Sequence, residues 1–413
     1  MKVSTDVLRR LPKTDLHLHL DGSLRLETLI ALASEHGVVL PAETPEGLLE
    51  TVFKAEYADL GEYLQGFAYT CAVMQTESAL ERVAYELAWD NINEGVRYIE
   101  VRFAPLLHTV NGLKTQEILE AVCKGFQRAK DEYNAKSVIV SKEEPPFHFG
   151  VIVCALRMFN ADIPGWYGEF YKMFQRTKEK DLFGLASLEL VKESIRCRDE
   201  LGLPIAGFDL AGQEDGYPAK HHNLAFEYAH QHFLMKTVHA GEAYGPESIF
   251  EAINFSHADR LGHGYHLFSP EKMRTSKVQG IEAREQYVED LIRYVSNRRL
   301  TIEVCISSNM QTNPEIGSVA EHHFGKMLEH KMSVSLCTDN RLISHTTVTD
   351  EYALALKHFE FTPKLLRNIV TYGFKRSFFF GTYLEKRNYV RECIDYFDKV
   401  WAEEVGNALT MQE

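Results

Sequence analysis

The chain has 413 residues, 45% of them hydrophobic, which is enough for two ordinary domains or one large barrel with insertions. Its formal net charge of −14 argues against a nucleic-acid partner, because neutralising phosphates requires clustered lysine and arginine. The seven scattered cysteines contain no Cys-x-x-Cys pair, and no apolar signal core or membrane-length apolar run occurs. We therefore expect a reduced, cytoplasmic protein without a membrane partner, as a monomer or small homo-oligomer.

Short apolar runs alternate with longer helical patterns along the chain. Eight such runs cover residues 14–20, 96–104, 147–156, 205–210, 236–240, 260–265, 300–307 and 332–338. Several are almost continuously apolar, as is typical of parallel strands buried on both faces, whereas the run at 96–104 alternates. Patterns with a period near 3.6 predict helices at 77–94, 115–133 and 280–297.

This alternation predicts an α/β fold, a (β/α)8 TIM barrel formed by one domain over residues 1–413. A doubly wound open sheet is the alternative, but no Gly-x-Gly-x-x-Gly follows the first strand. The first crossover, residues 24–95, is too long for one helix, so we expect extra helices that cover one end of the barrel. Residues 362–408 are largely helical in pattern and should pack outside it.

Ionisable side chains gather where the predicted strands end. His17 and His19 are two apart in the first strand and should project from the same face. Such a pair can bind a metal ion or simply be two histidines in a strand. His239, His263 and Asp339 end later strands, and the active site of a barrel lies at the carboxyl ends of its strands. The sequence therefore predicts one shared rim.

Six segments in order over roughly residues 10–345 resemble the adenosine deaminases of the amidohydrolase superfamily. They are Thr14-Asp-Leu-His-Leu-His-Leu-Asp-Gly22, Tyr98-Ile-Glu-Val-Arg-Phe-Ala-Pro105, Gly207-Phe-Asp-Leu-Ala-Gly212, Val238-His-Ala-Gly-Glu242, Arg260-Leu-Gly-His-Gly264 and Thr338-Asp339. The resemblance implies a (β/α)8 barrel with one divalent metal, usually Zn²⁺. It also implies hydrolytic removal of the 6-amino group of a purine nucleoside, adenosine or 2′-deoxyadenosine.

The resemblance also assigns roles around the metal. His17, His19 and His239 would be imidazole ligands and Asp339 a carboxylate ligand, with water in the open position. Glu242 would protonate purine N1, and His263 would orient the attacking water, whose proton Asp339 could accept. Taken singly, each residue has a plainer reading: a packed histidine, a helix cap, a solvated glutamate or a turn.

The substrate contacts implied by the resemblance come from several loops. Asp21, next to His19, would accept a ribose hydroxyl, and the backbone N–H of Gly212 would donate to purine N3. An apolar stripe at i, i+3, i+4 and i+7 reads plainly as the core face of a helix, and by resemblance as a lid over the substrate. Its members are Leu60, Tyr63, Leu64 and Phe67.

One position departs from the family pattern. The commoner Asp-Asp-Pro is here Asp339-Asn340-Arg341. The resemblance implies that the second carboxyl of this pattern donates to purine N7 when it is protonated. The Asn340 amide can make the same contact without being protonated. Another 6-aminopurine, such as adenine or a modified adenosine, therefore stays open as substrate. So does a non-enzymatic binding protein on the same fold. A binuclear amidohydrolase is disfavoured, because no lysine ends the fourth strand.

Overall fold

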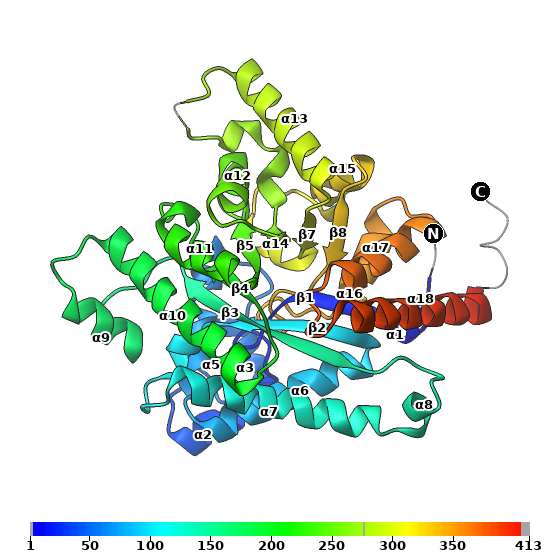
Figure 1. Ribbon diagram of the computed structural model, residues 1–413, viewed down its shortest axis with the longest axis horizontal. Coiled ribbons are helices and arrows are strands. Elements are labelled where there is room, and N and C mark those ends of the chain that lie inside the picture. The colour runs from blue at the N-terminus through cyan, green and yellow to red at the C-terminus, as the bar shows by residue number, and fades with distance from the viewer. Residues whose placement is uncertain (1–2, 276, 406–413) are drawn as a thin grey trace.

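The computed structural model describes residues 3–275 and 277–405, which form a barrel of eight parallel strands in chain order (Figure 1). The strands are β1 Lys13–His19, β2 Val96–Phe103, β3 His148–Leu156, β4 Ile205–Ala211, β5 Met235–Ala240, β6 Arg260–His263, β7 Thr301–Val304 and β8 Ser333–Leu336. Past the end of β8, the Asp339 N–H donates to the carbonyl of His17 (2.8 Å), and the His19 N–H donates to the carbonyl of Asp339 (2.7 Å). The first and last strands therefore meet. The predicted eight-stranded barrel is confirmed and the open sheet is excluded.

Three predicted strands end two or three residues earlier than the sequence indicates, at 260–265, 300–307 and 332–338, the last of which stops at Leu336. The run at 300–307 stops at Val304, because Ile306–Thr312 forms helix α14, whose first N–H groups donate to the carboxylate of Glu351. Because Glu351 is distant in sequence, no local pattern around residue 305 predicts that a helix begins there. The run at 260–265 stops at His263. His263 and Gly264 both have a positive φ (61° and 58°), which ends the extended conformation of the strand.

Five helices lie between β1 and β2. They are α2 Leu26–His36, α3 Pro45–Thr51, α4 Leu60–Tyr63, α5 Gly66–Val73 and α6 Glu77–Asn93. The single helix expected over residues 60–67 is wrong: the chain tightens after Tyr63, where the Gln65 N–H donates to the Glu62 carbonyl three residues back. Gly61 and Gly66, which weaken a helix, flank this break.

Most of the remaining helices surround the barrel (Figure 1), whereas α14 lies at the carboxyl ends of the strands, where Ser308 meets Asp339. Between strands lie α7 Thr115–Asn134, α8 Ser137–Val140, α9 Trp166–Met173, α10 Glu179–Leu201, α11 Asn223–Gln231, α12 Pro246–Phe255, α13 Ile281–Arg298, α14 and α15 Phe324–Glu329. At the two ends of the chain lie α1 Thr5–Arg10, α16 Val348–His358, α17 Pro363–Arg376 and α18 Tyr383–Val405. Helix α18 lies beside α1 (Figure 1), and Arg10 pairs with Glu403 at 3.1 Å. Residues 406–408 of the predicted helical region lie outside the described residues.

The barrel interior is charged rather than apolar. Glu100 and Arg102 of β2 point inward and meet Arg260 and Glu303 from β6 and β7, all fully buried. This explains the alternating run at 96–104, because charged residues two apart share the inner face. All seven cysteines are buried and free. Among the described residues, no helix is long and apolar enough to cross a membrane.

Candidate active site

A cavity of about 610 Å³ opens at the carboxyl ends of the strands. Every residue predicted for the site lines it except His17, which lies buried just below. The predicted residues in its wall are His19, Asp21, Leu60, Tyr63, Leu64, Phe67, Gly212, His239, Glu242, His263, Asp339 and Asn340. The fold thus brings together side chains that are spread over more than 300 positions of the chain.

Three imidazoles and one carboxylate converge at the base of this cavity. His239 Nε2 lies 3.1 Å from His17 Nε2 and 3.2 Å from His19 Nε2. Asp339 Oδ1 lies 3.4 Å from both His17 Nε2 and His19 Nε2. Ligands placed tetrahedrally about 2.0–2.1 Å from an ion would be about 3.4 Å apart. The spacing therefore fits one small metal ion.

The outer nitrogens of two rings strengthen this conclusion. His17 Nδ1 lies 2.9 Å from Glu303 Oε2, and His239 Nδ1 lies 3.1 Å from Asp209 Oδ2. A carboxylate can only accept, so each ring donates its Nδ1–H and keeps a lone pair on Nε2. Two such lone pairs 3.1 Å apart repel unless a cation lies between them. The donor set of three nitrogens and one oxygen suits zinc and similar ions.

Buried arginines keep these outer carboxylates ionised. Burial by itself would raise the pKa of Glu303, but the charges of Arg102 and Arg260 outweigh it and hold that pKa well below its usual range. Arg102 Nη2 donates to Glu303 at 2.9 Å and Arg102 Nη1 to Asp209 at 2.8 Å. Burial acts on Asp209 in the same way, and His239 and Arg102 hold its pKa low. Both carboxylates can therefore fix the rings of His17 and His239.

Glu242 sits on the loop that leaves β5, and another carboxylate holds that loop. The backbone N–H groups of Gly241, Glu242, Ala243 and Tyr244 donate to the buried carboxylate of Glu214 at 2.8 to 3.1 Å. Burial raises the pKa of Glu242 to about 8, although the nearby His239 opposes this. The Glu242 carboxyl can therefore hold a proton near neutral pH.

His263 and Asp339 face Glu242 across the rim. His263 Nε2 lies 3.7 Å from Glu242 Oε2 and has no hydrogen-bond partner among the described residues. Both His263 and Asp339 take a positive φ of 61°, which turns each side chain out of its strand direction. Ser308 Oγ donates to Asp339 Oδ2 at 2.6 Å and leaves Oδ1 to the imidazoles.

The upper wall carries the predicted substrate residues. Asp21 Oδ1 is buried without a hydrogen-bond partner, and burial raises the pKa of Asp21 to about 7. Asn340 Nδ2 donates to the hydroxyl of Tyr63 at 2.8 Å. Its Oδ1 fills the space where a side chain at position 22 would begin, so only Gly22 fits there. Gly212 has a φ of +96°, a conformation that favours glycine.

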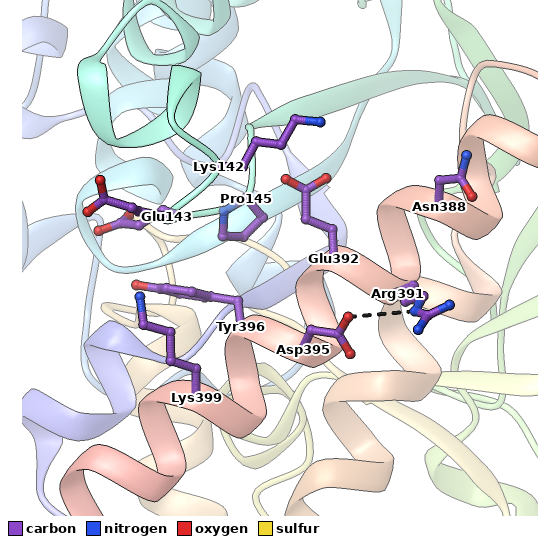
Figure 2. A pocket seen from close by; sticks show the side chains of 10 residues that line it. Lys142, Glu143, Pro145, Asn388, Arg391, Glu392, Asp395, Tyr396 and Lys399 are labelled. Carbon is purple, nitrogen blue, oxygen red and sulfur yellow. Dashed lines mark ion pairs between the residues drawn. The ribbon is translucent and has the colours of Figure 1, made fainter.

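A cavity elsewhere on the surface is unrelated to this rim. Figure 2 shows it between the loop around Pro145 and α18, with a volume of about 450 Å³. Its wall mixes both charges, and Arg391 pairs with Asp395 at 3.7 Å (Figure 2). None of the predicted site residues lines it.

Sequence reasoning missed the residues that support the rim. Glu214, Glu303 and Arg102 touch the predicted site residues or their loop, but none was assigned a role. For Arg102 and Glu303 a signal existed, because charges inside strands buried on both faces must be paired. For Glu214, two residues after Gly212, the sequence offers no comparable signal.

Comparison with known proteins gives consistent matches. A family model described as adenosine deaminase matches residues 12–199 and 184–395. An adenosine deaminase 1 from Streptomyces coelicolor is 37% identical over 365 residues, 87% of this chain and 80% of that protein. A probable adenosine deaminase from Dictyostelium discoideum is 34% identical over 91% of this chain, which spans only 42% of that longer relative.

Solved structures match the same fold. An adenine deaminase from Arthrobacter aurescens superposes with a TM-score of 0.71 at 23% identity, covering 94% of this chain and 99% of that one. An N6-mAMP deaminase from Arabidopsis gives a TM-score of 0.70 at 22% identity, covering 94% of this chain and 99% of that one.

Proposed function

The chain belongs to the adenosine deaminase family, and from that premise we propose that it hydrolyses adenosine and 2′-deoxyadenosine to inosine and 2′-deoxyinosine, releasing ammonia. One observation carries the proposal: a protonatable carboxyl, Glu242, and an unpartnered imidazole, His263, face the same cavity as the four-ligand cluster. This arrangement supplies an acid, a donor and a metal-binding group around one reacting carbon.

We propose zinc as the metal, one ion per chain, held by the side chains of His17, His19, His239 and Asp339. A bound zinc ion lowers the pKa of water and so makes a nucleophile available near neutral pH. Glu242 in its protonated form donates to purine N1, which draws electrons from C6. Asp339 accepts a proton from the nucleophile, and His263 donates through Nε2 to the oxygen that becomes anionic.

The remaining wall recognises the nucleoside. The free Asp21 Oδ1 accepts a ribose hydroxyl, and the Gly212 N–H donates to purine N3. Asn340 has a second amide hydrogen beyond the one given to Tyr63, and this hydrogen donates to N7. The substrate is covered by His19 and by the four side chains of the apolar stripe, which exclude water. These four are Leu60, Tyr63, Leu64 and Phe67.

The absence of cations favours a nucleoside over a nucleotide. Among the described residues, no lysine or arginine lines the cavity, and Asp21 would repel a phosphate placed near it. The resemblance in fold to an N6-mAMP deaminase therefore does not extend to an obvious phosphate site in this wall.

A second candidate is deamination of another 6-aminopurine, adenine or a modified adenosine. The observation that favours it is Asn340, where the family more often has aspartate, because a neutral amide changes the local charge around N7.

Metal analysis combined with a substrate screen tests both candidates. We expect one equivalent of zinc and the highest kcat/KM on adenosine and deoxyadenosine, with AMP much poorer. A preference for adenine or an N6-substituted nucleoside would favour the second candidate. Metal-loaded protein that deaminates none of these compounds would refute both.

A further inference from the structure

Two buried side chains outside the proposed catalytic set form a hydrogen-bonded chain that ends on His263. The Phe324 backbone N–H donates to His322 Nδ1 at 3.0 Å. His322 Nε2 lies 3.3 Å from Asn309 Oδ1, and Asn309 Nδ2 lies 3.1 Å from His263 Nδ1. Asn309, His322 and His263 are all at most 2% exposed, so water does not compete for these bonds.

The chain of bonds has only one consistent direction, because it starts on a backbone N–H. That group can only donate, so His322 Nδ1 accepts and the neutral ring carries its proton on Nε2. His322 Nε2–H then requires an acceptor opposite, which identifies the facing Asn309 atom as the oxygen. The Asn309 amide nitrogen therefore faces His263 Nδ1 and donates to it.

We infer that His322 and Asn309 are positioning residues that fix His263 in the tautomer with its proton on Nε2. This nitrogen has no partner among the described residues and faces the cavity beside Glu242. In this tautomer His263 presents a donor to the reacting oxygen. In the other it would present a lone pair, which repels a developing oxyanion. Burial also lowers the pKa of His322 to about 3, so the ring stays neutral and the direction of the bonds persists near neutral pH.

His323, which follows His322 in the sequence, provides a matched control for substitutions of His322. His323 Nδ1 bonds to the carbonyl of Tyr265 at 2.7 Å, and its ring stacks on Tyr265. Its hydrogen bond and ring contacts go to Tyr265 and Phe268 and not to Asn309 or His263. A substitution of His322 therefore affects the hydrogen bonds that lead to His263, whereas a substitution of His323 affects only packing beside them.

The experiment measures the tautomer directly, by two-dimensional ¹⁵N–¹H spectra of histidine-labelled, zinc-loaded full-length protein without substrate. The His263 signals are identified as those missing in His263→Gln. We expect Nε2 to be the protonated nitrogen in the wild type. Asn309→Asp places an acceptor opposite Nδ1, so we expect the proton there to move to Nδ1. His322→Phe should populate both tautomers, His322→Gln should restore the wild-type pattern because its amide can donate, and His323→Phe should leave it unchanged.

Kinetics on the same proteins complete the test. The expected effect of the tautomer on the rate rests on the proposed deaminase activity. We expect Asn309→Asp to lower kcat about 100-fold while KM changes less than about twofold. A wild-type His263 protonated on Nδ1 would overturn the inference even if the Asn309 variant fails to fold. So would a reversed tautomer in Asn309→Asp with kcat within about twofold of wild type. A wild type with the expected tautomer and no deaminase activity would refute the proposed function and leave the tautomer assignment standing.

Discussion

Glu242 and Asp339 are carboxyl groups on the same rim with opposite protonation behaviour. Burial raises the pKa of Glu242 to about 8. The Asp339 carboxylate instead accepts from Ser308 Oγ at 2.6 Å and lies 3.4 Å from the Nε2 atoms of His17 and His19, where a bound cation would keep it ionised. Two carboxyl groups that are in opposite protonation states can serve as acid and base at the same pH.

Replacing Glu242 with glutamine tests the acid role. Glutamine keeps the shape of the side chain but cannot transfer a proton to N1, so we expect kcat to fall about 100-fold or more. Because Glu242 is not in the four-ligand set, the zinc content should stay at one equivalent, which metal analysis checks in parallel. Near-native turnover in this variant would contradict the assignment.

Replacing Asn340 with leucine tests the proposed contact with N7. Leucine has a similar volume but no donor, and it also loses the bond to Tyr63. We expect kcat/KM for adenosine to fall about tenfold or more. Asn340→Asp is the informative companion: its carboxyl can donate only when protonated, so its activity relative to wild type should decline as pH rises. Unchanged kcat/KM in the leucine variant would remove Asn340 from the site.

At the scale of elements, periodicity located most strands and helices because each buries a regular face. The predicted helices at 115–133 and 280–297 correspond to α7 and α13 within one residue at each end. The failures had two causes, a distant contact at one place and a local tightening of the chain at the other. Helix α14 begins where Glu351 caps it, and the stripe at 60–67 is split although its four side chains still line the cavity.

The loop after β5 offers a test at this scale. Glu214→Gln replaces one acceptor oxygen with an amide that faces backbone N–H groups, so the loop carrying Glu242 loses bonds from residues 241–244. We expect kcat to fall at least about tenfold with zinc retained. Asp215→Asn makes the same charge change one residue later, at an exposed position paired with Arg274, and should have little effect. Equal effects of the two variants would show that Glu214 acts only through charge.

For the whole molecule, the sequence predicted which residues share the rim, but not which buried charges pair beneath it. Two kinds of information predicted the rim: active sites of barrels lie at the carboxyl ends of the strands, and the family motifs are short. Both depend only on residues that are adjacent in sequence. The links among Glu303, Arg102 and Arg260 join three strands across the barrel interior, and no local pattern states which buried charges pair. Such pairs cost desolvation, so each partner is needed once the others are buried.

Metal removal tests the barrel as a unit. Without a cation, the Nε2 lone pairs of His17 and His239 face each other at 3.1 Å, so we expect chelator-treated protein to unfold at a lower temperature. Adding zinc at 100 times its Kd should contribute about 2.7 kcal/mol and restore the Tm, which scanning calorimetry measures. His17→Ala should bind no stoichiometric zinc and show no zinc-dependent rise. A Tm that is insensitive to zinc in the wild type would argue against a metal at this position.

The meeting of β1 with the segment after β8 has a consequence for how the protein is made. His17 and His19 are synthesised more than 300 residues before Asp339. An ion that requires all four ligands cannot settle until the last barrel strand has left the ribosome and paired with the first. Binding of such an ion would then follow the synthesis of β8, and an occupied site would mark a chain whose barrel has closed.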